Sequence, residues 1–128
     1  MRHSRIQAVD HVNVESPHGL DDELRWFYGE VAELEERPPE ATMGPGICFR
    51  SERIELRIRF SPEPRIESVE CRVIVGVPSI DEAAERLSER KTPFQRLSGL
   101  AWSDRRIQVL DPAGNRVELR QAQRDIPL

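Results

Sequence analysis

Two short charged segments, which repeat almost letter for letter, carry the residue types best suited to chemistry. Residues 53–57 read Arg-Ile-Glu-Leu-Arg, and residues 116–120 read Arg-Val-Glu-Leu-Arg. Each alternation of apolar and charged residues predicts a β-strand with one buried face and one charged face. Glu55 and Glu118 stand at the middle of the two charged faces. A single such Glu is usually the solvent side of a sheet, but two at matching positions of a repeat call for a further explanation.

Arginines accompany both Glu residues on these charged faces. By strand alternation, Arg57, Arg59 and Arg120 project to the same side as the Glu residues. Guanidinium groups bind carboxylates and phosphates through paired hydrogen bonds. We therefore expect either a cavity for an anionic ligand lined by Arg57 and Arg120, or solvated charges on a sheet surface. The solvated alternative is favoured for Arg59.

The elements that must position these residues occur in a repeated order of strand, helix and strands. In the first half, the periodicity predicts strands over residues 6–14, 47–50 and 53–60, a helix over 20–34, and a loop with at most one short edge strand over 35–46. In the second half it predicts strands over 69–77, 94–97, 105–110 and 115–121, and a helix over 79–90 that begins with a capping box of Ser79 and Glu82.

The two halves align as copies of one unit. His11-Val12-Asn13-Val14 aligns with Arg72-Val73-Ile74-Val75, and Glu55 aligns with Glu118. The separations are 44 residues from His11 to Glu55 and 46 residues from Arg72 to Glu118. Two anchors at nearly equal spacing predict an α+β fold built from a duplicated βαβββ unit, with units over residues 6–60 and 69–121.

Length and composition limit the classes of protein to consider. At 128 residues the chain, 1–128, is expected to form one domain with its own hydrophobic core. A net charge of −4 argues against nucleic-acid binding, and no apolar run is long enough to span a membrane. Cys48 and Cys71 form no CxxC motif and are expected to be reduced. The start of the chain has no apolar signal region, so we expect a cytoplasmic protein.

Three motifs carry a resemblance to a known family. They are Asp10-His11-Val12, Arg25-Trp26-Phe27-Tyr28 and, most diagnostic, Asp111-Pro112-Ala113-Gly114-Asn115-Arg116-Val117-Glu118. With these motifs the chain resembles the vicinal-oxygen-chelate superfamily of glyoxalase I, bleomycin-resistance proteins and extradiol dioxygenases over about residues 6–121. The resemblance implies that the two tandem βαβββ units form a curved mixed sheet around a cavity. It also implies a metal held by His11, Glu55, residue 72 and Glu118.

Arg72 departs from the pattern, because metal-binding members of that family usually have His at this position. Arg has no acceptor atom and keeps its charge, so it cannot be a metal ligand. We therefore predict that Arg72 pairs with Glu55 or Glu118, and that the protein is a small-molecule-binding or orphan glyoxalase-like protein with a degenerate metal site and no cofactor.

Two enzymatic alternatives remain open. In the first, His11, Glu55 and Glu118 hold Zn, Ni, Mn or Fe in a divalent-metal-dependent lyase, isomerase or dioxygenase. In the second, no metal takes part, Glu55 or Glu118 is the catalytic base, and Arg72 stabilises an enolate or oxyanion.

Further ligand contacts are expected around the same cavity. Asn13 shares the face of His11, and Trp102 lies in the loop before a strand, where it is either a lid over the cavity or simple loop packing. The predicted ligand-binding residues are thus Asn13, Arg57, Arg120 and Trp102. The resemblance also implies a homodimer, which would cover sheet edges, with the cavity lying either within one chain or between two.

Overall fold

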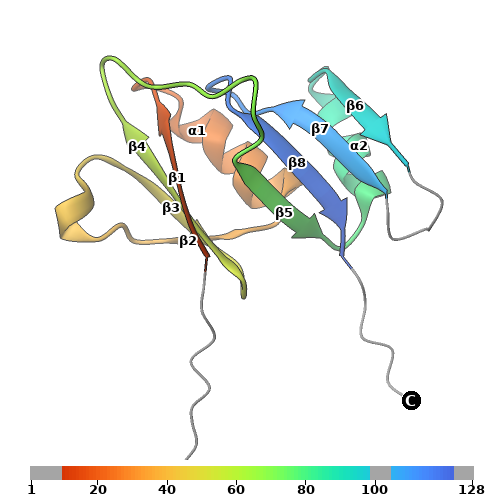
Figure 1. Ribbon diagram of the computed structural model, residues 1–128, viewed down its shortest axis with the longest axis horizontal. Coiled ribbons are helices and arrows are strands. Elements are labelled where there is room, and N and C mark those ends of the chain that lie inside the picture. The colour runs from red at the N-terminus through yellow and green to blue at the C-terminus, as the bar shows by residue number, and fades with distance from the viewer. Residues whose placement is uncertain (1–9, 99–104, 123–128) are drawn as a thin grey trace, which may run out of the picture.

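The computed structural model describes residues 10–98 and 105–122, which form two four-stranded sheets with the helices packed on their inner faces (Figure 1). The first sheet has the order β1-β4-β3-β2, and its strands are β1 (Asp10–Ser16), β2 (Glu35–Arg37), β3 (Gly46–Arg50) and β4 (Ile54–Phe60). The second has the order β5-β8-β7-β6, and its strands are β5 (Val73–Val77), β6 (Phe94–Leu97), β7 (Arg106–Leu110) and β8 (Arg116–Gln121).

The helices occupy equivalent places in the two units. The first unit has α1 (Asp21–Leu24), which continues as the π-helix η1 (Arg25–Val31), and a short 3-10 turn, η2 (Ala41–Met43). The second unit has α2 (Ile80–Glu89), whose capping box forms as predicted because Ser79 Oγ accepts a hydrogen bond from the Glu82 N–H. No helix of the described residues is long and apolar enough to cross a membrane.

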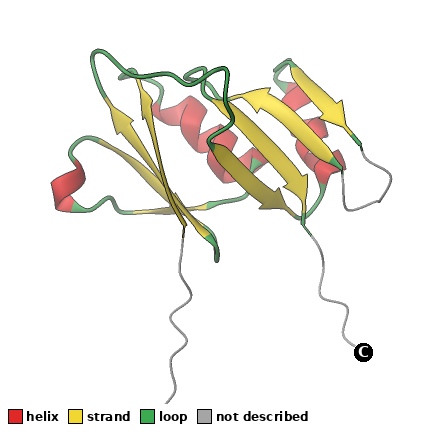
Figure 2. Cartoon of the chain, viewed as in Figure 1, coloured by secondary structure: helices red, strands yellow, loops and turns green. Residues whose placement is uncertain are grey.

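Both sheets are mixed in the same way. β1 pairs in parallel with β4 and β5 pairs in parallel with β8, whereas the remaining pairs are antiparallel. The prediction of an α+β fold from two βαβββ units is therefore confirmed, with two open sheets in place of one continuous sheet. A loop over residues 61–72 connects the units and passes across one end of both sheets (Figure 2).

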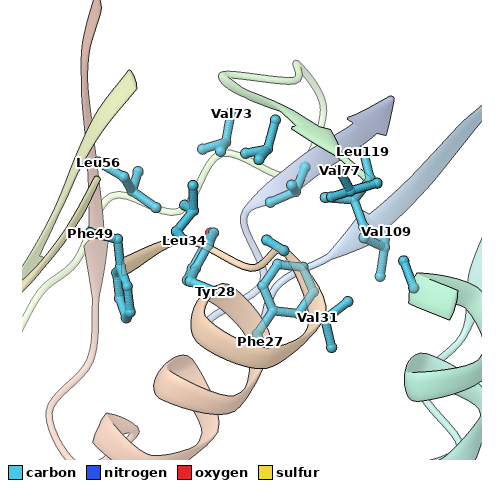
Figure 3. Packing of buried hydrophobic residues seen from close by; sticks show 14 of the residues in the cluster. Phe27, Tyr28, Val31, Leu34, Phe49, Leu56, Val73, Val77, Val109 and Leu119 are labelled. Carbon is cyan, nitrogen blue, oxygen red and sulfur yellow. The ribbon is translucent and has the colours of Figure 1, made fainter. Parts of the chain in front are cut away.

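The π-helix is the centre of the hydrophobic core. Its buried Phe27, Tyr28 and Val31 lie between the two sheets (Figure 3). The first sheet contributes Phe49 and Leu56, and the second contributes Val73, Val109 and Leu119. Because side chains alternate along a strand, the charged faces of both sheets point away from this shared core, so each unit presents its charged face on its own outer side.

Trp26 packs within this chain. In an α-helix over residues 20–34 it would lie off the apolar face, but the i to i+5 pairing of a π-helix changes which side chains share a face. Trp26 is only 9% exposed, and the Arg90 guanidinium of the neighbouring helix lies 4.4 Å from the centre of its ring. This cation–π contact helps to join the two units.

The predicted strand over residues 69–77 is four residues too long, because β5 begins at Val73. The Glu67 carboxylate accepts the backbone N–H groups of both Val69 and Glu70, so these donors are used outside the sheet. Val69 is correspondingly 82% exposed. These side-chain hydrogen bonds replace sheet pairing over the start of the predicted strand.

The turn at residues 111–115 fixes the two units to each other. The buried Asp111 carboxylate accepts hydrogen bonds from the Tyr28 hydroxyl, at 2.6 Å, and from the backbone N–H groups of Ala113 and Asn115. The Asn115 side chain donates to the Glu15 carbonyl at the end of β1 and accepts from the Glu67 N–H of the connecting loop. The most diagnostic motif of the sequence thus has a structural role in this fold.

Candidate functional site

The position that matches His11 in the second unit is Ile74. In the parallel ladders, His11 lies beside Glu55 and Ile74 lies beside Glu118. The separation from Ile74 to Glu118 is 44 residues, the same as from His11 to Glu55. The predicted alignment of Arg72 with His11 is therefore wrong by two residues. A shift of two keeps the same strand face, which is why the alternation could not detect the error.

Glu55 is held by its neighbour along the strand. Its Oε2 atom accepts hydrogen bonds from Arg57 Nε at 2.8 Å and from Arg57 Nη2 at 2.6 Å. His11 Nδ1 lies 3.7 Å from the same oxygen, with half of its side chain exposed. The structure therefore brings His11 and Glu55 together, but the carboxylate is already engaged by a guanidinium group.

Glu118 has an equivalent partner and a more enclosed position. Its side chain is 7% exposed, and its Oε2 atom accepts a hydrogen bond from Arg120 Nε. Its Oε1 atom lies 3.4 Å from the Gln108 amide nitrogen and 4.0 Å from Arg106 Nη1. Burial acts to raise the pKa of Glu118, but the hydrogen bonds from Arg120 and Gln108 and the positive charges of Arg120 and Arg106 outweigh it, so the pKa lies below its usual value.

The predicted ligands do not form a metal site within one chain. Across residues 10–98 and 105–122, no three His, Cys, Asp or Glu side chains are grouped so as to hold a metal ion. His11 and Glu55 lie on the first sheet and Glu118 on the second, where the fourth ligand position is the apolar Ile74. Two guanidinium groups beside Glu118 also oppose a cation electrostatically. Within one chain, the residues present therefore do not fit the metal that the family resemblance implies.

Arg72 forms no ion pair with Glu55 or Glu118, contrary to the prediction. The ion pairs of Glu55 and Glu118 are made instead with the arginines that follow them by two residues, Arg57 and Arg120. Arg72 precedes β5 and lines an open cleft of about 1300 Å³ between the two sheets, together with Ile74. Its charge contributes to lowering the pKa of Glu67, after the backbone hydrogen bonds from Glu70 and Val69.

A cavity of about 360 Å³ lies over the charged face of the first sheet. Its lining combines residues of β1 and β4, all charged or polar except Val14, with three residues of the segment before β3. They are Asn13, Val14, Glu15, Glu40, Thr42, Met43, Arg57 and Arg59. The structure thus places Asn13 and Arg57 of the predicted ligand-binding set in one cavity, and Arg120 on the outer face of the other sheet. Trp102 lies outside the described residues.

Arg59 also lines the cavity, but more than half of its side chain is exposed and its guanidinium forms an ion pair with Glu15 at 3.1 Å, which agrees with the solvated position favoured for it. Glu40, Thr42 and Met43 were not predicted as site residues, because residues 35–46 were interpreted as a connecting loop. The signal was the flanking Pro38-Pro39 and Gly44-Pro45-Gly46, which restrict the backbone on both sides of η2.

Solved structures with this fold cover nearly the whole chain. A protein of Bacillus anthracis assigned to the glyoxalase family is 27% identical, with a TM-score of 0.73 over 95% of this chain and 100% of that chain. The antibiotic binding protein TnmS3 from Streptomyces sp. CB03234 is 20% identical, with a TM-score of 0.65 over 94% of this chain and 100% of that chain. The fosfomycin resistance protein FosX from Listeria monocytogenes is 14% identical, with a TM-score of 0.68 over 93% of this chain and 96% of that chain.

Comparison of the sequence with family models and with curated proteins finds no similar protein. No model of a protein family matches the chain. A search of curated proteins also gives no match.

Proposed function

Because the chain has the fold of the vicinal-oxygen-chelate superfamily, we propose that it is a small-molecule-binding protein whose ligand occupies the cavity over the first sheet. We propose further that the ligand carries a carboxylate or phosphate group and binds without a metal ion. The observation that carries this proposal is the position of Arg57, a half-buried guanidinium that lines the cavity beside Asn13. Two of the similar proteins, TnmS3 and FosX, are named for antibiotic binding and fosfomycin resistance.

The Arg57 guanidinium is already held in a fixed orientation that can bind an anionic ligand. Its Nε and Nη2 atoms are fixed by Glu55, which sets the plane of the guanidinium and leaves further N–H groups for a ligand. An anchored side chain loses little conformational entropy when a ligand binds. The hydrogen bond that Arg57 donates to Glu55 is the first cause of the raised pKa of Arg57, so the group keeps its charge.

We also propose a homodimer that completes this site. By strand alternation the charged face of each sheet points away from the shared core, so we propose that a second chain is needed to close the cavity over a ligand. The face of the second sheet that carries Glu118 also carries the exposed apolar side chains of Ile74 and Leu110. In the described part of the chain, β1 and β5 are edge strands of their sheets. Light scattering should give twice the chain mass at micromolar concentration, and a monomer would contradict this arrangement.

The alternative function is a divalent-metal-dependent lyase, isomerase or dioxygenase. It is favoured by the contact between His11 and Glu55, two residue types that ligate Zn, Ni, Mn and Fe. In the proposed dimer, Glu118 of the partner subunit would have to supply the third ligand. Metal analysis of protein purified without chelator separates the alternatives, because one metal ion per chain would support the enzyme and oppose metal-free binding.

The proposed function is tested by the position at which anions bind. Amide chemical shifts are recorded during titration with small carboxylates, phosphates and phosphonates in the presence of EDTA. We expect shifts around Asn13 and Arg57, and loss of binding in the Arg57→Gln variant. Arg72→Gln removes the same charge from the cleft between the sheets and is the matched control. If Arg57→Gln binds as tightly as the wild type, the ligand does not occupy this cavity.

A further inference from the structure

We propose that Glu40 is a built-in competitor of the ligand, and that an anionic ligand enters the cavity by replacing Glu40 at Arg57. This inference rests on the proposed function, because it concerns the same cavity. It adds the identity of the group that the ligand displaces, and a limit on the charge of the ligand.

The two carboxylates that face Arg57 differ in distance and exposure. Glu55 Oε2 lies 2.6 Å from Arg57 Nη2, and the Glu55 side chain is 23% exposed. Glu40 Oε1 lies 3.9 Å from the same nitrogen, and the Glu40 side chain is 74% exposed. A short, partly buried pair is retained, whereas a long pair in solvent contributes little and exchanges readily. Glu40 is therefore the partner that a ligand can replace.

The backbone at Glu40 is fixed without help from its side chain. The Glu40 carbonyl accepts a hydrogen bond from the Met43 N–H at 3.0 Å. The Cys48 thiol lies 3.4 Å from the Met43 sulfur and fixes this side chain against the sheet. Gly46 leaves space for the Met43 side chain, because a Cβ at position 46 would lie 2.4 Å from the Met43 methyl carbon. The Glu40 side chain can therefore move away from Arg57 while η2 keeps its place over the cavity.

The balance of charges limits the ligand to one anionic group. Arg57 and Arg59 face three carboxylates, those of Glu15, Glu40 and Glu55. When Glu40 leaves, two positive and two negative charges remain, so one carboxylate or one phosphate monoanion restores the charge that Glu40 supplied. A polyanion would meet the uncompensated repulsion of Glu15 and Glu55. The ligand class is thus a small molecule with a single oxyanion.

The test compares Glu40→Gln with a variant that changes the net charge equally elsewhere. Acetate and inorganic phosphate are titrated separately at low ionic strength into wild type, Glu40→Gln and Glu85→Gln, which lies exposed on α2 of the second unit. Amide shifts of the residues around the cavity report binding. An exposed ion pair contributes up to about 1 kcal/mol, so we expect Glu40→Gln to bind about two- to fivefold more tightly than Glu85→Gln. This gain should shrink in high salt.

The outcomes separate this inference from the proposed function. Tighter binding of acetate alone assigns a carboxylate to the ligand, and tighter binding of phosphate alone assigns a phosphate; either supports the inference. Equal affinities of Glu40→Gln and Glu85→Gln, with binding still lost in Arg57→Gln, would overturn the role of Glu40 and leave the cavity as the ligand site. Binding that persists in Arg57→Gln would overturn the proposed function itself.

Discussion

Replacing Tyr28 by Phe tests whether the buried contact with Asp111 joins the two units. The change removes one hydroxyl and keeps the ring that packs against Phe27 and Phe49. Asp111 Oδ2 then keeps only the Asn115 amide, at 3.4 Å, in place of a hydroxyl at 2.6 Å. Because a hydrogen bond to a charged group contributes about 1.5–3 kcal/mol, we expect the free energy of unfolding to fall by about 2 kcal/mol at pH 7.

The same change should lower the melting temperature. At about 2.1 cal/mol/K of unfolding entropy per residue, a chain of 128 residues has about 0.27 kcal/mol/K. A loss of about 2 kcal/mol therefore corresponds to a fall of about 7 °C. Urea and thermal unfolding, followed by circular dichroism, measure both quantities.

The effect of Tyr28→Phe should depend on pH in a defined direction. Burial raises the pKa of Asp111 against the hydrogen bonds from Tyr28, Asn115 and Ala113, which lower it. A carboxyl group with a raised pKa contributes stability that is fully present below its unfolded pKa and is lost as pH rises through its folded pKa. Without the hydroxyl the folded pKa rises further, so the loss caused by Tyr28→Phe should be larger at pH 7 than at pH 4.

Asp111→Asn is the matched control for this pH dependence, because it removes the titrating group. Adding Tyr28→Phe to Asp111→Asn should cost the same at both pH values, and the two changes should be non-additive at pH 7. A cost below about 0.5 kcal/mol for Tyr28→Phe at pH 7, the range of ordinary surface substitutions, would refute the reasoning.

Three further changes test the structure around the site. Asn115→Ala removes the hydrogen bonds that join β1 and the connecting loop to the turn, and should cost about 2–4 kcal/mol in urea unfolding, whereas a neutral result would show that the turn does not join the units. Gly46→Ala would place its Cβ 2.2 Å from the Ile58 carbonyl oxygen, so we expect a loss of about 1–3 kcal/mol, and an unchanged melting temperature would contradict this packing. Arg120→Gln should raise the pKa of Glu118, measured by NMR of its carboxyl carbon, and an unchanged pKa would refute the pairing. A carboxylate with a lowered pKa contributes stability that is lost as pH falls through its folded value, so the variant should also be less stable than the wild type above about pH 4.5.

The fold could be predicted from the sequence because the repeated unit has recognisable signals for both its strands and its helix. Strand alternation placed Glu55 and Glu118 on charged faces, and the capping box at Ser79 placed the second helix. The same alternation could not distinguish Arg72 from Ile74, because residues two apart share a face. Only the strand register resolves them.

The cavity could be predicted only in part, because its lining comes from two kinds of structure. Asn13 and Arg57 follow from strand periodicity, which local sequence determines. Glu40 and Met43 lie at the two ends of the short 3-10 turn η2, whose position depends on tertiary contacts such as that between Met43 and Cys48. Such contacts have no periodic signal in the sequence.

The proposal of metal-free binding is tested most directly by calorimetry with and without metal. The anion that shifts the cavity residues most strongly is titrated into the protein in EDTA, and again after removal of EDTA and addition of zinc. We predict the same affinity in both experiments, one ligand per chain, and no binding by Arg57→Gln. Binding that appears only after zinc is added, and that is lost in His11→Ala, would contradict the proposal and favour the metal-dependent enzyme.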